Sequence, residues 1–207
     1  MLTSAHAIIA RMKNRRAVYA DLYQLPPNVN GEIIDGELYV SQRPASPHAV
    51  AATMMGTDIV GPFGRKPGGP LGPGGWWILF EPELHFGEDV LIPDFAGWRH
   101  ERMPRVPSVP GFTLAPDWLC EVASPSTARL DRAVKLPVYA QKGITHVWLV
   151  DPLARTLEVL RLESGRYSII AVHSANDRVR AEPFEAVELD LARWWLEEEE
   201  PLAAAAP

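Results

Sequence analysis

The sequence predicts an α/β fold in which helices flank a mixed β-sheet, with an additional antiparallel β-hairpin region. Two short apolar runs, typical of buried strands, stand on either side of a helical segment, which is the pattern of a strand–helix–strand unit. Several β-rich runs are separated by two-residue turn dipeptides, which predicts hairpins. The 207 residues, 47% of them apolar, suffice for one sizeable core.

The N-terminal part is predicted to supply two helices with a hairpin between them. Residues 5–23 alternate polar and apolar side chains at helical spacing. Glu32–Gln42 predicts a tight hairpin with Asp35-Gly36 as its turn. Pro47–Ile59 predicts a helix, with Ser46 as its N-cap. We expect residues 1–22 to form a separate helical segment ahead of a domain spanning 23–196.

The middle of the chain is predicted to hold a loop and a second hairpin. Residues 61–75 are mostly glycine and proline, which excludes regular structure and predicts a surface loop. Two strand-like runs then follow, residues 76–87 and 89–99, with Gly87-Glu88 as their turn.

The C-terminal part contains the strand–helix–strand unit. Asp117–Ala123 predicts a buried strand, and a helix with Ser124 as its N-cap should run until Gly143 stops it. His146–Asp151 predicts the second buried strand, and a third hairpin turns at Ser164-Gly165. A short terminal helix should precede an acidic and alanine-rich tail, residues 197–207, which we expect to be disordered.

Composition limits the possible functions. A net charge of −6 and a pI near 5.5 argue against a protein whose whole surface grips nucleic acid, but they are compatible with an acidic metal site. The single cysteine, Cys120, excludes an internal disulfide and a cysteine-based zinc site. No run of about eighteen apolar residues occurs, and the N-terminal residues are ordered wrongly for a secretory signal. We therefore expect a cytoplasmic protein.

Three residues on consecutive elements predict a metal-dependent hydrolytic site. Asp94 lies in one strand, Glu121 in the next central strand, and Lys135 on the crossover helix. Neighbouring strands are about 5 Å apart, so the two carboxylates can line one pocket. Acids this close repel unless they are protonated or bridged by a cation. Hard oxygen ligands suit Mg²⁺ or Mn²⁺, which would bind a phosphate oxygen and activate water, with Lys135 positioning that water.

Each of these residues also has an ordinary structural explanation. Asp94 alone could be a solvent-facing or turn residue, and Glu121 could be an edge-strand glutamate paired with an arginine. An unpaired carboxylate in so apolar a run is costly, however, which favours a metal at Glu121. Lys135 and Asp131 could form an exposed i,i+4 ion pair. Pro137 should kink the helix and tilt Lys135 toward the strands.

Three segments resemble a known family: GEIIDGELYVSQRPASPH, LIPDFAGW and APDWLCEVASPSTARLDRAVKLPVYAQKGITHVWLVDP. With the β-rich segment that follows them, they cover most of Tyr23–Ile170. In these segments the chain resembles the Uma-type family of "putative restriction endonucleases", a branch of the PD-(D/E)XK nuclease superfamily. The resemblance implies a restriction-endonuclease-like core and metal-assisted hydrolysis of nucleic acid, with DNA as the expected substrate.

The resemblance also implies roles for individual residues. Asp94 and Glu121 become metal ligands, assisted by the backbone carbonyl at Val122. The superfamily pattern places a lysine two residues after Glu121, where this chain has Ala123, so Lys135 on the helix becomes the candidate catalytic lysine. Two further acids and a histidine match the family's first hairpin and the segment after it: Glu37 as a further catalytic group or ligand, Glu32 as a weaker candidate, and His48.

Other interpretations stay open at this point. The chain could be a catalytically inactive nuclease-fold module that binds nucleic acid or dimerises, which the acidic pI and Ala123 favour. A metal-independent glycosidase could use the same two acids. A homodimer is expected for an enzyme that cuts both strands. Two groups of residues could contact nucleic acid, although surface charge and core packing explain them equally well: Arg99, Arg102, Arg105, Arg129 and Arg132, and the pairs Trp76-Trp77 and Trp194-Trp195.

Overall fold

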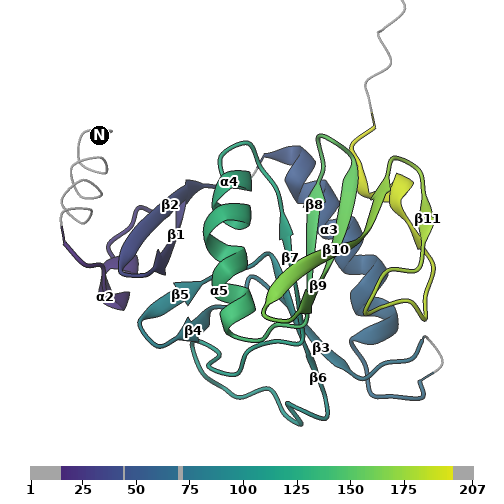
Figure 1. Ribbon diagram of the computed structural model, residues 1–207, viewed down its shortest axis with the longest axis horizontal. Helices are drawn as coiled ribbons and strands as arrows, with labels where there is room; N and C mark the ends of the chain where they lie inside the picture. The colour runs from purple at the N-terminus through teal and green to yellow at the C-terminus, as the bar shows by residue number, and fades with distance from the viewer. Residues whose placement is uncertain (1–14, 44, 70–71, 198–207) are drawn as a thin grey trace, which may run out of the picture.

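A six-stranded mixed sheet forms the centre of the protein, in a computed structural model that describes residues 15–43, 45–69 and 72–197 (Figure 1). The strand order is β10-β9-β8-β7-β6-β3. The strands are β3 (Trp76–Phe80), β6 (Phe95–Arg99), β7 (Trp118–Val122), β8 (His146–Asp151), β9 (Thr156–Glu163) and β10 (Arg166–Ser174). β7 and β8 are parallel, as the strand–helix–strand pattern predicts, and the other neighbours are antiparallel. The predicted mixed sheet is confirmed.

A smaller antiparallel sheet with the order β2-β1-β5-β4 lies beside it. Its strands are β1 (Val29–Ile34), β2 (Glu37–Gln42), β4 (Leu84–Phe86) and β5 (Asp89–Leu91). The predicted hairpin is present as β1–β2. Its turn residues Asp35 and Gly36 have φ of 53° and 75°, and positive φ at both central positions is what this kind of tight turn requires.

The second predicted hairpin is only partly right, because each of its two runs is divided between the sheets. The chain leaves the large sheet after β3, makes the β4–β5 hairpin in the small sheet, and returns as β6. Pro82 and Pro93 stand at the two crossings and cannot donate to a β-ladder. The residues next to these prolines still pair across the two crossings, since the N–H of Glu81 donates to the carbonyl of Asp94 at 2.9 Å. The two sheets therefore meet beside Glu81 and Asp94.

Helix α3 (Ser46–Phe63) covers one face of the large sheet. Ala52, Met55, Ile59 and Phe63 recur at helical spacing and are buried, which explains why the helix continues past the predicted end at Ile59. Its N-cap is Ala45 rather than the predicted Ser46, which is the first helical residue.

The crossover between β7 and β8 is less regular than the single helix predicted from Ser124. Residues 124–127 form a turn, followed by α4 (Ala128–Leu130), a π-helical turn (Asp131–Lys135) and α5 (Leu136–Gln141). In a regular helix Pro137 would lack a hydrogen bond and collide with the carbonyl four residues earlier. The π-helical turn lies just before Pro137, so the chain departs from the regular α-helical pattern where the proline disfavours it.

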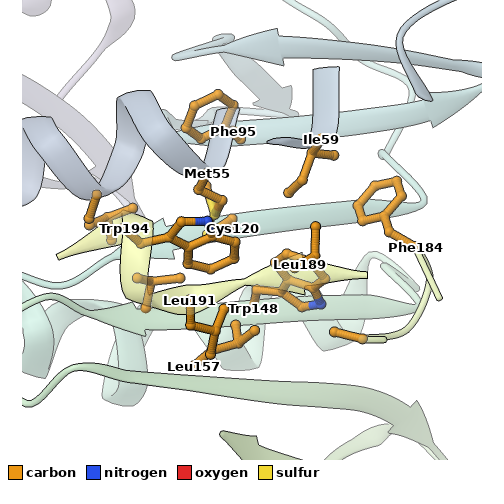
Figure 2. Packing of buried hydrophobic residues seen from close by; sticks show 14 of the residues in the cluster. Met55, Ile59, Phe95, Cys120, Trp148, Leu157, Phe184, Leu189, Leu191 and Trp194 are labelled. Carbon is orange, nitrogen blue, oxygen red and sulfur yellow. The ribbon is translucent and has the colours of Figure 1, made fainter. Parts of the chain in front are cut away.

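Two apolar clusters pack against opposite faces of the large sheet. Figure 2 shows the first, in which Met55 and Ile59 of α3 meet Cys120 and Trp148 of the strands. The C-terminal segment joins this cluster through β12 (Leu189–Asp190) and a 3₁₀ turn (Leu191–Trp194), and β12 pairs with β11 (Arg178–Val179). The second cluster places Tyr139 of α5 against the other face.

Several predictions concern the chain ends and the tryptophans. Of the predicted N-terminal helix, residues 15–23 are described, and only α2 (Tyr19–Leu22) is helical, so the prediction is wrong for residues 15–18. Residues 5–14 and 198–207 lie outside the described part of the chain. The predicted terminal helix is the 3₁₀ turn.

Trp76, Trp194 and Trp195 are core residues, and Trp77 packs beside the second cluster. Among the described helices, none has the length and apolar character needed to traverse a bilayer.

Candidate active site

A small cavity of about 60 Å³ opens where the two sheets meet. Its walls come from the β1–β2 hairpin, the first turn of α3, the segment between β5 and β6, the end of β7 and the crossover turn. The lining includes five acidic residues and two basic ones: Glu32, Glu81, Asp94, Glu121, Asp131, His48 and Lys135. We refer to it as the acidic cavity.

Asp94 and Glu121 lie side by side in this cavity because their strands pair. Phe95 is opposite Cys120 in the β6–β7 ladder, which puts the preceding Asp94 next to Glu121. The ladder ends there, so the N–H of Val122 is free to donate to Asp94 Oδ2 at 2.7 Å. Both predicted acids therefore line one cavity, as their positions in the sequence indicate.

Lys135 reaches the same cavity from the π-helical turn. Its Nζ is 2.8 Å from Glu121 Oε1, 3.0 Å from Glu32 Oε1 and 3.5 Å from Asp131 Oδ1. Only 3% of the lysine side chain is exposed, so the pair with Asp131 is buried rather than the exposed i,i+4 pair considered above. Lys135 thus links three carboxylates from three elements.

Two further hydrogen bonds fix the acids that Lys135 contacts. The hydroxyl of Tyr139 on α5 donates to Glu121 Oε1 at 2.5 Å, and both groups are buried. The N–H of Ile92, just beyond the end of β5, donates to Glu32 Oε1 at 2.7 Å. Glu32 and Glu121 are therefore held in place from two sides.

His48 contacts the other predicted ligand. From the first turn of α3, its Nε2 is 3.0 Å from Asp94 Oδ1, while its buried Nδ1 has no hydrogen-bond partner among the described residues. Burial by itself lowers the pKa of His48, but the hydrogen bond and negative charge of Asp94 outweigh that effect and raise it. The imidazole is thereby biased toward the charged form.

The electrostatics of the cavity are dominated by excess negative charge. Burial raises the pKa of Glu121 well above its usual range; Lys135 opposes the rise, and the nearby carboxylates add to it. Burial likewise raises the pKa of Asp131 to about 6, and it raises the pKa of Glu81. Lys135 keeps its charge, because its carboxylate partners raise its pKa against the opposing effect of burial.

The donor set fits a divalent cation in chemistry, although it is not assembled as a finished site. Within the described ranges, no three His, Cys, Asp or Glu side chains are already gathered at metal-binding spacing. Five carboxylates nevertheless face one lysine and one histidine across the cavity. Hard oxygen donors with surplus negative charge suit Mg²⁺ or Mn²⁺, and a bound cation would relieve the repulsion between carboxylates that adds to the effect of burial on these pKa values.

Comparison with known proteins identifies the family. A family model described as "Uma2: Putative restriction endonuclease" matches residues 19–192. The chain belongs to this family. The crystal structure of "a putative nuclease belonging to DUF820 from Anabaena variabilis ATCC 29413" superposes with a TM-score of 0.65 at 21% identity, covering 86% of this chain and 98% of that one. This likeness confirms the α/β fold. No curated protein sequence matches the chain.

The structure separates Glu37 from the other predicted site residues of this Uma2 chain. Glu37 is exposed at the start of β2, accepts a hydrogen bond from the Tyr39 hydroxyl at 2.9 Å, and lines a neighbouring cavity. Glu32, the weaker sequence candidate, lies in the acidic cavity in its place. Val122 also lines the acidic cavity, and its role as a carbonyl ligand stays a prediction.

Three of the five arginines near the site in sequence are engaged elsewhere. Arg132 pairs with Glu158 and Arg102 with Asp117, while Arg99 lies over the Trp76 ring. None of the three lines the acidic cavity.

Sequence analysis missed part of the site of this Uma2 member. Asp131 was considered only as the partner of Lys135 in an exposed ion pair, and neither Tyr139 nor Glu81 was assigned a role in the site. The useful indication in the sequence was the acid–amine spacing between Asp131 and Lys135 next to Pro137, which marks a helix that cannot be regular. Nothing comparable marks Glu81, whose place depends on how the two sheets meet.

Proposed function

We propose that this Uma2 chain is a divalent-metal-dependent endonuclease that hydrolyses DNA phosphodiester bonds. One observation carries the proposal: the carboxylates of Asp94 and Glu121, from paired strands, line one cavity with the ammonium group of Lys135. Two acids to hold a cation and an amine to stabilise negative charge supply the main requirements of phosphodiester hydrolysis.

Each residue has a distinct role in this proposal. Asp94 and Glu121 would hold Mg²⁺ or Mn²⁺, and the backbone carbonyl of Val122 would add a third oxygen donor. When bound, the ion neutralises charge on the phosphate and lowers the pKa of the attacking water. Lys135 orients that water and offsets the negative charge that builds on phosphorus as the new P–O bond forms and the old one breaks. Tyr139 keeps Glu121 oriented through its hydrogen bond.

The first experiment measures cleavage by the purified full-length protein. End-labelled single-stranded DNA, duplex DNA and RNA are incubated with Mg²⁺, Mn²⁺ or EDTA. We expect metal-dependent cleavage of DNA that EDTA abolishes. Cleavage that persists in EDTA would instead support a metal-independent hydrolase.

Matched variants show whether the cleavage belongs to this protein. Asp94→Asn and Glu121→Gln should each lower the rate by about two orders of magnitude or more, the scale for loss of a main electrostatic contributor to catalysis. Glu88→Gln makes the same charge change at an exposed hairpin residue and should cleave like the wild type. Circular dichroism confirms folding. Equal rates for all three variants would refute the proposal.

A second candidate is a catalytically inactive module that binds nucleic acid or dimerises. It is favoured by Ala123 in place of the superfamily lysine, and by the commitment of Lys135 to three carboxylates. Calorimetric titration with Mn²⁺ separates the two candidates. Binding that Asp94→Asn weakens supports the enzyme, and absence of binding at millimolar Mn²⁺ supports the module.

We also propose that the enzyme acts as a homodimer, because cutting both strands of a duplex takes two sites. Analytical ultracentrifugation with and without duplex DNA tests this. A monomer under both conditions would contradict it.

A further inference from the structure

A second, larger cavity of about 380 Å³ adjoins the acidic cavity. It lies between the β1–β2 hairpin and the residues that lead into α4. Glu32, Ser41 and Thr127 line both cavities, so the two lie side by side along these residues. A molecule whose phosphate occupied the acidic cavity would extend into the larger one.

One face of the hairpin forms a wall of the larger cavity. Glu37, Tyr39 and Ser41 alternate along β2 and therefore point to the same side. Tyr39 is opposite Glu32 in the β1–β2 register, which places these two on that side as well. This wall presents a half-buried aromatic ring, a hydroxyl and two carboxylates to the cavity.

The opposite wall is made of small polar groups. Ser126 and Thr127 place hydroxyl-bearing side chains there, and Leu130 adds an apolar surface. Aromatic, apolar and hydrogen-bonding groups thus surround a space near the lower end of the roughly 300–1,000 Å³ range of small-ligand sites.

The charges of this cavity disfavour a phosphate as its occupant. Glu37 contributes a negative charge to the lining, and the second carboxylate there, Glu32, is paired with Lys135. The guanidinium of Arg15 also lines the cavity, but it is committed to a two-pronged ion pair with Asp21 at 2.5 and 2.9 Å. An uncharged, flat group with hydrogen-bond donors fits such a lining better than an anion does.

We propose that this cavity binds the nucleoside next to the phosphate that is cut, with its base beside Tyr39 and its amino group donating to Glu37. The inference rests on the proposed function, since it takes the ligand to be part of a nucleic acid. Glu37, predicted from the sequence as a catalytic residue, becomes a specificity residue that favours bases carrying an amino group. Carboxylates accept hydrogen bonds from base amino groups in this way.

This site also defines the class of substrate. A base inside a duplex is covered on both faces by its neighbours, so a whole base enters a cavity only when it is unpaired or turned out of the stack. The substrate is accordingly a single strand, or a duplex in which the nucleotide at each cleavage point is unpaired or turned out of the stack.

The test measures nucleoside binding without cleavage. Saturation-transfer NMR is recorded for the full chain in EDTA with millimolar deoxyguanosine, deoxyadenosine, deoxycytidine or thymidine. Saturation should reach the base protons of the three nucleosides with amino groups, and thymidine should bind most weakly. Glu37→Gln should reduce that difference, whereas Glu88→Gln should preserve it.

A cavity-filling variant provides the decisive comparison. Ser126 is exposed at the cavity wall, so Ser126→Trp can block the space without disturbing the core. It should weaken binding by about tenfold or more, the equivalent of roughly 1.4 kcal/mol. Ser108→Trp, on an exposed loop elsewhere, should bind like the wild type. No saturation transfer with the wild type, or equal binding by both tryptophan variants, would overturn the inference.

These results remain separate from the test of the proposed function. DNA cleavage without nucleoside binding would remove the subsite and leave the endonuclease. Nucleoside binding at this cavity without cleavage under any metal would keep the subsite and remove the endonuclease.

Discussion

Replacement of Lys135 by methionine isolates the contribution of one buried ammonium group. The long apolar side chain of methionine fills most of the same space, while the ion pairs with Glu32, Glu121 and Asp131 are lost. Removing one partner of a buried ion pair typically costs about 3–5 kcal/mol, because charge is left buried without compensation. For a protein of this size each 1 kcal/mol lowers the melting temperature by about 2–4 °C, so we expect a decrease of roughly 6–20 °C at pH 8.

The loss should depend on pH in a definite direction. Lys135 lowers the pKa of both Glu121 and Asp131, so these values rise further when it is removed. A carboxyl group whose pKa is higher in the folded state stabilises that state while protonated, and this stability disappears as the pH rises through the folded-state pKa. The variant should therefore lose much less stability at pH 5 than at pH 8.

The assay is urea and thermal unfolding followed by tryptophan fluorescence at both pH values. Lys66→Met removes an exposed lysine from a surface loop and serves as the control, with an expected change below about 0.5 kcal/mol. The double variant Lys135→Met/Glu121→Gln should recover part of the loss. A melting temperature within about 2 °C of the wild type at pH 8, or the same decrease at both pH values, would refute this account of the cavity.

Three further changes test individual features of the fold. Asp131→Asn should raise the free energy of unfolding at pH 8 and make it depend less on pH between 4 and 6, because the pKa of Asp131 rises from 3.8 to about 6 on folding. Urea unfolding curves from pH 4 to 8 check both effects, and the same pH dependence as in the wild type would contradict them. Cys120 is buried and its thiol pKa is raised by that burial, so a thiol reagent at pH 8 should modify it only after unfolding in urea; rapid modification of the native protein would show that the core is open. Gly36→Ala should cost about 1–2 kcal/mol in urea unfolding, since Gly36 has a φ of 75°; Gly69→Ala is the control, and an equal effect of both would contradict the turn geometry.

Local patterns in the sequence were sufficient for most of the secondary structure. Asp35-Gly36 fixes a turn chemically, and the apolar runs of β7 and β8 mark buried strands independently of anything distant. The division of residues 76–99 between two sheets was not predictable in the same way. It depends on which strands β4 and β5 find as partners, and β1, the partner of β5, comes from a segment more than fifty residues away.

The residues of the candidate site differ in the same way: some could be predicted from local sequence, and others depend on long-range contacts. Glu121 stands out because a carboxylate in a buried strand needs a partner, and Asp94 follows from strand pairing. The resemblance favoured Glu37 over Glu32, but the hairpin itself does not distinguish them, since their cross-strand partners Ile34 and Tyr39 put both on the same face. Which acid enters the cavity depends on where that hairpin meets the large sheet, which is a long-range property of the fold.

Interrupted backbone pairing explains why the carboxylates gather at this point. Pro82 and Pro93 end the strands at the crossings between the sheets, and the N–H groups of Ile92 and Val122 are then left to donate to Glu32 and Asp94. These N–H groups would otherwise face a cost for burial without a partner.

In the crossover between β7 and β8, a proline again interrupts regular backbone pairing beside buried charged groups. Pro137 disfavours the regular α-helical pattern, and the widened turn before it holds Asp131 and Lys135 together at the cavity. From that turn the ammonium group of Lys135 comes within 2.8 Å of Glu121. The residues that break regular structure thus determine where charged side chains can be buried, and the charge they accumulate there is what a cation and a phosphate would neutralise.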